Sequence, residues 1–185
     1  MRIIAGEFRG RSIDAPPGLA TRPMLDRVRE ALFSTLAPWL REAVVLDLFA
    51  GSGSLGLEAL SRGARRVRFV EQGPGALAQL RKNIGQLGVG GRAEIVPGNA
   101  FTEATWVIDV DVAFLDPPYE LLTRSRPRVL AAAARLVTGF LAPEGVVVLH
   151  TPHGALTTQE LAPARVRVRR YGTNDLWYLE RPAEG

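Results

Sequence analysis

The chain has 185 residues, which suits a single domain with a sizeable core and is short for two. It contains no cysteine, which excludes disulfides, thiolate metal sites and a cysteine nucleophile, and two histidines are too few for a convincing zinc site. All but one of its 23 basic residues are arginine, and the net charge of +4 fits an anionic partner, although arginine-rich codon usage accounts for part of this excess.

No stretch is long and apolar enough to span a membrane, and the first residues are too polar for a signal peptide. We therefore expect a cytoplasmic protein with no membrane partner. Residues 1–185 are predicted to form one domain, because no linker, repeat or low-complexity segment divides the chain. Residues 1–25 are expected to form a small arm or hairpin, rich in arginine and glycine, and residues 26–185 the main body.

A helix is predicted to begin at Asp26, a suitable N-cap, because apolar residues then recur at helical spacing as far as Trp39. Five strands follow, alternating with helices. The strands are expected from Val44 to about Asp47 and over 67–71, 93–97, 110–115 and 145–150, and the helices over 54–62, 74–87 and 126–140, with one helical turn within 101–106. A turn over residues 172–174 then joins strands 166–171 and 176–180 in a hairpin.

Alternating strands and helices require a parallel sheet that is covered on both faces, and a final hairpin adds antiparallel pairing. The sequence therefore predicts an α/β fold. Its centre is expected to be a Rossmann-like, seven-stranded, mostly parallel sheet with a C-terminal β-hairpin and a small N-terminal arm.

The turn after the first strand, Gly51-Ser52-Gly53, has the composition of a cofactor-binding loop. Its glycines can adopt positive φ and let a ligand lie against bare backbone, and the following helix presents free N–H groups to the turn. The spacing Gly51-x-Gly53-x-x-Gly56 also matches the dinucleotide fingerprint, with Glu71 at the position, about 20 residues on, of its ribose-binding acid. A nucleotide-like cofactor is the predicted occupant.

Asp47 distinguishes between the two cofactors that fit this pattern. Its carboxylate is expected at the mouth of the turn, where it repels a pyrophosphate and suits a cationic amino-acid group. S-adenosylmethionine carries such a group and has no phosphate. The stretch from Asp47 through Phe49 and Ala50 to Gly53 is similar to motif I of the class I methyltransferases. Their seven-stranded sheet also ends in a hairpin, whereas the domain of an NAD-dependent oxidoreductase does not.

A second motif, Asp116-Pro117-Pro118-Tyr119, ends the fourth strand. Ligands of open α/β sheets lie beyond the carboxyl ends of the strands, so this motif is expected to face the cofactor loop. Two prolines remove backbone donors and leave carbonyls free to accept, while Asp116 adds a side-chain acceptor and Tyr119 a flat face. Two acceptors and a stacking ring fit the exocyclic amine of a nucleobase extruded from its stack. The simpler alternative is a Pro-Pro turn with a capping aspartate.

The second motif has the form of motif IV of amino-methyltransferases that act on DNA or RNA, and the rest of the chain resembles the RsmD family of bacterial 16S rRNA (guanine-N2)-methyltransferases. This resemblance covers nearly the whole chain. It is carried by residues 2–6, 9–11, 22–23, 26–30, 46–53 and 56–64. The chain departs from the family pattern at Met24-Leu25, at Gly73 and at Asn99, where an aspartate often accepts the adenine amino group.

The resemblance implies transfer of a methyl group from S-adenosylmethionine to the N2 of one guanine in small-subunit ribosomal RNA. The partner is 16S rRNA or an assembling small ribosomal subunit, and no metal is implied. The implied cofactor-binding residues are Asp47, Phe49, Ala50, Gly51, Ser52, Gly53, Glu71 (ribose), Asn99 and Ala100 (adenine), and Asp116. The implied catalytic residues are Asp116, Pro117, Pro118 and Tyr119, and the arginines expected to contact RNA phosphates are Arg9, Arg11, Arg22, Arg27 and Arg29.

Three alternatives stay open from the residues alone. A DNA adenine-N6 methyltransferase shares both motifs and differs in lacking the N-terminal arm. An NAD-dependent oxidoreductase fits the glycine spacing but not Asp47 or the second motif. A non-catalytic RNA-binding module explains the charge and leaves both motifs without a role.

Overall fold

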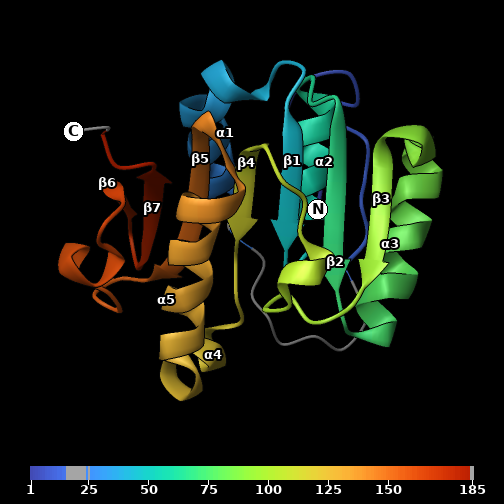
Figure 1. The fold of residues 1–185 in the computed structure, drawn as a ribbon. Coiled ribbons are helices and arrows are strands. Elements are labelled where there is room, and N and C mark those ends of the chain that lie inside the picture. The colour runs from blue at the N-terminus through green and yellow to red at the C-terminus, as the bar shows by residue number, and fades with distance from the viewer. Residues whose placement is uncertain (16–23, 25, 184–185) are drawn as a thin grey trace.

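The computed structural model describes residues 1–15, 24 and 26–183. Seven strands form one sheet in the order β3-β2-β1-β4-β5-β7-β6, with helices on both faces (Figure 1). The predicted α/β class, the number of strands and the C-terminal hairpin are confirmed. No helix within the described residues is long and apolar enough to cross a membrane.

The elements follow the predicted alternation along the chain. The helices are α1 (Asp26–Leu40), α2 (Ser54–Ser61), α3 (Pro74–Leu87), α4 (Tyr119–Arg124) and α5 (Arg126–Arg135), with short helical turns η1 (Gly90–Arg92), η2 (Glu103–Thr105), η3 (Leu136–Phe140) and η4 (Thr158–Leu161). The strands are β1 (Val44–Leu48), β2 (Arg66–Glu71), β3 (Ala93–Pro97), β4 (Val110–Leu115), β5 (Leu141–Pro152), β6 (Arg165–Tyr171) and β7 (Asn174–Glu180).

Strands β1 to β5 pair in parallel, and β7 pairs antiparallel with both β5 and β6. The chain order of the strands reverses between β1 and β4, which is where open α/β sheets bind ligands. Leu48 at the end of β1 pairs with Leu115 at the end of β4. The glycine-rich turn and the Asp-Pro-Pro-Tyr motif therefore leave the sheet from neighbouring strands at its carboxyl edge.

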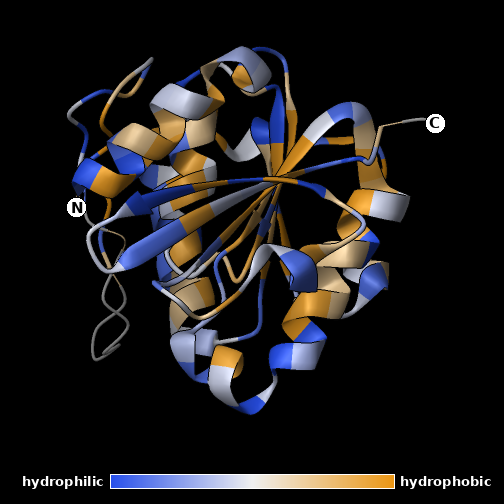
Figure 2. Cartoon of the chain, turned by 90° about the vertical axis from the view of Figure 1, so that its left-hand side faces the viewer, coloured by the Kyte–Doolittle hydropathy of each residue, from blue (hydrophilic) through white to orange (hydrophobic). Residues whose placement is uncertain are grey.

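Two apolar layers hold the helices against the sheet. Helices α1, α2 and α3 bury their apolar sides on one face, and α4, α5, η3 and η4 cover the other. In Figure 2 the strands at the centre of the molecule are accordingly mostly hydrophobic. This three-layer arrangement is the one that a parallel sheet needs, because both of its faces are apolar.

The N-terminal segment is a hairpin that packs onto the helices. Arg2 and Ser12 form an isolated antiparallel bridge, and Ile3, Phe8 and Ile13 are buried in the layer beneath α1 to α3. Over residues 1–15 the predicted arm is therefore part of the folded body. Its remaining residues, 16–23 and 25, lie outside the described part of the chain.

Two regions differ from the prediction. The second motif runs directly into the short helix α4, which begins after Pro118 and was not predicted. The helix expected over 126–140 is α-helical only to Arg135 and continues as a single π-helical turn, η3. Strand β5 then begins at Leu141, because Pro143 cannot continue a helix and forces extended backbone before it, and a register shift against β4 accommodates the extra residues.

Candidate functional site

The backbone of the glycine-rich turn adopts positive φ angles, which favour glycine. Gly51 and Gly53 have φ of 57° and 85°, and Phe49 before them has φ of 62°. Left-handed backbone at a residue with a side chain is uncommon, so the turn holds Phe49 in a strained conformation next to the predicted cofactor site. Gly56 allows α2 to lie close to β2, since a Cβ atom there would be 2.2 Å from Cε1 of Phe69.

Asp47 lies beneath this turn, and the prediction that it stands at the mouth of the turn is wrong. Its side chain is only 1% exposed, and one carboxylate oxygen, Oδ2, accepts the Gly56 N–H at 2.9 Å. Burial raises the pKa of Asp47 to about 8, although the Gly56 N–H opposes the shift, and the charges of Asp116 and Glu71 raise it further. Without a cation beside it, Asp47 is therefore mostly protonated at neutral pH.

Glu71, at the end of β2, organises the backbone around the turn. Its Oε2 accepts the Gly51 N–H at 2.8 Å, and its Oε1 accepts the N–H groups of Gln72 and Gly73 at 2.9 and 2.7 Å. A carboxylate has about four acceptor positions, so Oε2 retains capacity for one more hydrogen bond. The predicted ribose-binding acid thus already has a structural role, holding together the ends of β1 and β2.

Asn99 and Ala100 follow β3 at the same edge of the sheet. Asn99 is exposed, and its Oδ1 accepts the Phe101 N–H at 2.9 Å, while Ala100 is buried. The Phe101 ring meets Phe49 edge-on, with centroids 5.3 Å apart, and the Arg128 guanidinium lies 4.6 Å above it. Phe101 therefore joins the loop after β3 to the glycine-rich turn.

The second motif belongs to a hydrogen-bonded network of four side chains. Asp116 Oδ1 lies 2.8 Å from His150 Nδ1 at the end of β5, and His150 Nε2 lies 3.0 Å from Asn174 Oδ1 in β7. The Tyr119 hydroxyl donates to the same Asn174 oxygen at 2.8 Å. Pro117 is buried, whereas Pro118 is exposed and Tyr119 is 46% exposed, so the tyrosine ring keeps an open face.

Histidine 150 bonds two acceptors at once, which favours its protonated form. Burial lowers the pKa of His150, but the hydrogen bond to Asp116, the charge of Asp116 and the bond to Asn174 raise it by more, so the net shift is upward. The imidazolium then donates from both ring nitrogens. The hydrogen bond from His150 fixes Asp116 Oδ1 and leaves Oδ2 as the acceptor of the motif.

Three residues around the site were not predicted from the sequence: His150, Asn174 and Asn83. Asn83 lies in α3 and donates to the carbonyls of Ser52, at 2.9 Å, and of Asp14, at 3.0 Å, so it anchors the glycine-rich turn to the N-terminal hairpin. Of the three, only His150 had a signal in the sequence, because it is a polar residue at the end of an apolar strand. Its partner Asn174 was predicted in a turn but is the first residue of β7.

One of the five arginines expected to contact RNA is not on the surface. Arg29 is 1% exposed and donates to the Arg2 carbonyl and to Asp26, so its assignment to RNA binding is wrong: it anchors the N-terminal hairpin to α1. Arg9, Arg11 and Arg27 are exposed, and Arg22 lies outside the described residues. Arg11 donates to the Gln86 carbonyl in the last turn of α3, which places that part of the hairpin toward the amino edge of the sheet.

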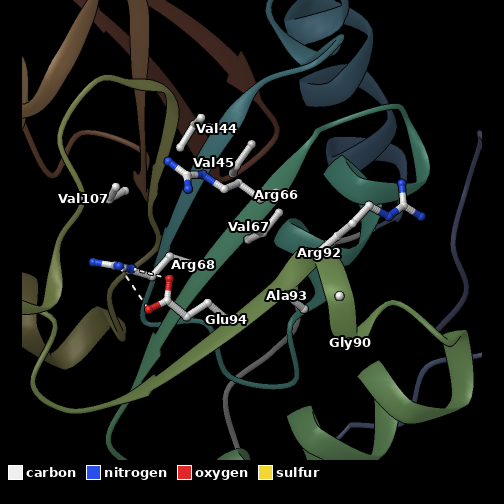
Figure 3. Close-up of a pocket in the computed structure, with 11 residues that line it drawn as sticks. Val44, Val45, Arg66, Val67, Arg68, Gly90, Arg92, Ala93, Glu94 and Val107 are labelled. Atoms are coloured by element: carbon white, nitrogen blue, oxygen red, sulfur yellow. Dashed lines mark hydrogen bonds and ion pairs between the residues drawn. The ribbon is translucent and has the colours of Figure 1, made fainter.

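A cavity of about 320 Å³ opens at that amino edge, away from both motifs (Figure 3). It is lined by the first residues of β1, β2 and β3, including Val44, Arg66 and Ala93. The ion pair between Arg68 and Glu94, with two contacts of 2.9 and 3.0 Å, lies along it. Because ligands of this sheet architecture bind at the carboxyl edge, this cavity is not the cofactor site.

The sheet order, the glycine-rich turn after β1 and the Asp-Pro-Pro-Tyr motif after β4 define a class I methyltransferase. A putative methyltransferase from Escherichia coli, yhhF, superposes with a TM-score of 0.83 at 34% identity, covering 100% of this chain and 99% of that one. An RNA methyltransferase from Salinibacter ruber in complex with S-adenosyl-L-homocysteine is 22% identical, with a TM-score of 0.62 over 89% of this chain and 96% of that one, and shares the fold.

A family model described as "Conserved hypothetical protein 95" matches residues 1–180. Ribosomal RNA small subunit methyltransferase D of Escherichia coli strain K12 is 40% identical over 150 residues, which are 80% of this chain and 72% of that protein. The putative rRNA methyltransferase YlbH of Bacillus subtilis strain 168 is 38% identical over 124 residues, 65% of this chain and 67% of that protein. The chain belongs to this family, the RsmD family of methyltransferases.

Proposed function

We propose that this protein transfers a methyl group from S-adenosylmethionine to the N2 amine of a guanine in small-subunit ribosomal RNA. The single observation that carries the proposal is the position of Asp116 at the end of β4, beside the end of β1: its Oδ1 is bound by His150, and its Oδ2 takes no bond from the described residues. Family membership supports the substrate, because relatives at 36–42% identity carry the name ribosomal RNA small subunit methyltransferase D.

The residues at the carboxyl edge fit S-adenosylmethionine. Asp47 Oδ1 takes no bond from the described part of the chain and can accept from an ammonium group, Glu71 Oε2 can accept from a ribose hydroxyl, and exposed Asn99 can accept from the adenine amine. When bound, the cofactor supplies an electrophilic methyl group on a sulfonium. The Asp-Pro-Pro-Tyr motif would have no role in an NAD-dependent oxidoreductase, which disfavours that alternative.

The acceptor pocket of the proposed reaction consists of hydrogen-bond acceptors. Asp116 Oδ2 and the Pro117 carbonyl accept the N–H groups of the amine and turn its lone pair toward the methyl donor, so orientation is the main catalytic contribution. The open face of Tyr119 stacks on the extruded base. Guanine N2 lies beside N1–H, a second donor, whereas adenine N6 lies beside an acceptor, so a pocket of acceptors favours guanine.

The experiment is replacement of Asp116. Asp116→Ala is expected to lower the rate of methyl transfer roughly 10²–10³-fold, as loss of an oriented transition-state contact does, and to leave S-adenosylhomocysteine affinity in calorimetry nearly unchanged. Glu120→Ala is the matched control, since that carboxylate is 80% exposed on α4 and lies four residues along the chain. Near-normal methyl transfer by Asp116→Ala would contradict the proposed mechanism.

A further inference from the structure

The strand β6 is a basic edge strand that the site does not use. It is the outermost strand of the sheet beyond β7, and its sequence, Arg-Val-Arg-Val-Arg-Arg-Tyr, contains four arginines and no acidic residue. Arg165, Arg167, Arg169 and Arg170 are all exposed. Figure 2 looks onto the side of the molecule where this strand lies.

Three of these arginines form a row. Successive side chains of a strand point to opposite faces, so Arg165, Arg167 and Arg169 share one face and stand roughly 6–7 Å apart. Their partners in β7 are Glu180, Tyr178 and Leu176. A straight row of evenly spaced guanidinium groups matches a polyanion whose charges also repeat at even spacing.

The positive charge of the row is only partly compensated. Arg165 and Arg167 share one carboxylate, Glu180, at 3.7 and 3.9 Å, which is longer than a hydrogen bond. Arg169 has no carboxylate within ion-pair distance in the part of the chain that the structure describes, and Arg170 pairs with Asp175 on the other face at 3.4 Å. Donors on all three residues of the row are therefore available to an anion.

The row leads to the acceptor site. Because β6 runs in the same direction as β5, its last residues lie at the carboxyl edge of the sheet, and Tyr171 pairs with Asn174. Asn174 is the residue that binds both His150 and the Tyr119 hydroxyl. A strand of nucleic acid whose base occupies the site beside Tyr119 can continue along β6 without crossing the molecule.

We propose that the β6 row, Arg165, Arg167 and Arg169, binds successive phosphates of the RNA strand that flanks the target nucleotide. This inference rests on the proposed function for the identity of the polyanion. Arg9 and Arg11, two of the five arginines expected from the sequence to contact RNA, lie on the hairpin that contacts the last turns of α2 and α3, toward the opposite edge. The β6 row, unlike these two residues, continues directly from the site.

The test compares two triple variants with equal loss of charge. Arg165→Gln/Arg167→Gln/Arg169→Gln removes the row, and Arg41→Gln/Arg65→Gln/Arg66→Gln removes three exposed arginines at the amino edge. The probe is an unmethylated transcript of small-subunit rRNA, and the readouts are the salt dependence of its binding, sedimentation of the free protein and S-adenosylhomocysteine affinity. A third variant, with lysine at the three β6 positions, retains the charge.

Each phosphate contact in single-stranded RNA contributes roughly 0.7 to the slope of log affinity against log salt. The β6 glutamine variant is therefore expected to lose about two units of slope, with cofactor affinity unchanged, while the amino-edge and lysine variants keep the slope. An unchanged slope, or an equal loss in the amino-edge variant, would overturn the inference. Self-association of the β6 variant with an unchanged slope would overturn it too, since the arginines would then serve to block strand pairing at the sheet edge.

Failure of the β6 inference can be distinguished from failure of the proposed function. Binding is measured without methyl transfer, so the slope tests the β6 row even if the wild-type protein methylates no guanine. Conversely, methylation of rRNA by the wild-type protein supports the proposed function whichever way the slope comes out.

Discussion

Asp47 and Asp116 lie at the ends of neighbouring strands, and their surroundings differ. Asp47 is buried beneath a backbone turn, which raises its pKa to about 8. Asp116 is partly exposed, and its Oδ1 is bonded to His150. One carboxylate is thus ready to become charged when a cation arrives, and the other is held in place by a hydrogen bond.

The raised pKa of Asp47 predicts how cofactor affinity depends on pH. Pairing with the ammonium group of the cofactor requires ionised Asp47, so below about pH 8 binding must release its proton. Affinity for S-adenosylhomocysteine, measured by calorimetry, is expected to rise from pH 6 toward pH 8, by up to about tenfold per pH unit, and then to level off. Asp47→Asn should bind more weakly and without this rise. A flat wild-type profile between pH 6 and 8 would refute the role of Asp47.

The ion pair of His150 predicts a pH dependence of stability. A histidine whose pKa is raised in the folded state contributes stability that is fully present below its unfolded pKa, about 6.5, and is lost as the pH rises through the folded value. The difference in unfolding free energy between wild type and His150→Gln is therefore expected to shrink with rising pH above about 6.5. Urea denaturation across pH 5–9 measures it, and a difference independent of pH would show that His150 is not charged.

Residues within one motif were easier to predict than residues that meet across the sheet. The glycine-rich turn and Asp-Pro-Pro-Tyr are contiguous, so their chemistry is visible in the sequence. The network of His150 and Asn174 around Asp116 depends on which strands lie next to β4 and on the register between β5 and β7, which no local pattern specifies. The burial of Asp47 and Arg29 was not predicted either, because each side chain is enclosed by tertiary packing and binds a backbone group outside its own helical turn or strand, Gly56 for Asp47 and Arg2 for Arg29.

The N-terminal hairpin is attached to α2 by a buried carboxylate. Glu58 is fully buried, and it accepts the N–H groups of Ile4 and Ala5 at 2.7 and 3.1 Å and the Arg62 Nε–H at 2.7 Å. Ser61 adds two further bonds, accepting the Phe8 N–H at 3.0 Å and donating to the Ala5 carbonyl. Helix α2 thus provides hydrogen-bond partners for the backbone of the N-terminal hairpin, whose two strands pair with each other only through one isolated bridge.

Removing that carboxylate should destabilise the protein strongly. Glu58→Ala leaves Arg62 and two backbone N–H groups without their acceptor, and the unfolding free energy is expected to fall by about 3–5 kcal/mol. Glu94→Ala is the control, because its pair with Arg68 is exposed and should contribute less than about 1 kcal/mol. Equal effects of the two variants in urea denaturation would contradict this account of the hairpin.

The secondary structure was largely predictable because its signals are local. Asp26 at the start of α1 and Gly88 at the end of α3 mark helix boundaries that the structure confirms. The alanine-rich segment carried no signal for its change to a π-helical turn after Arg135, which accompanies the burial of Leu136 and Val137. The early start of β5 had a signal in Pro143, but the register shift in its pairing with β4 had none.

At the scale of the whole molecule, the two edges of the sheet carry different features. The carboxyl edge carries the turn after β1, the motif after β4 and the end of β6, while the amino edge carries the cavity of Figure 3 and the hairpin contacts near Gln86. Asp116 and the end of β6 therefore lie at the same edge of the sheet. An RNA strand approaching that edge meets the methyl-transfer site and the proposed phosphate contacts together.

The most direct test of the proposed function is the identity of the methylated nucleoside. The protein and labelled S-adenosylmethionine are incubated with unmethylated small ribosomal subunits, with rRNA extracted from them, and with duplex DNA, and each substrate is digested to nucleosides. Unpaired bases are the favoured RNA targets because A-form grooves hide base edges. We predict labelled N2-methylguanosine from the small-subunit RNA and no product from DNA. N6-methyladenine as the main labelled product, or label in DNA, would contradict the account.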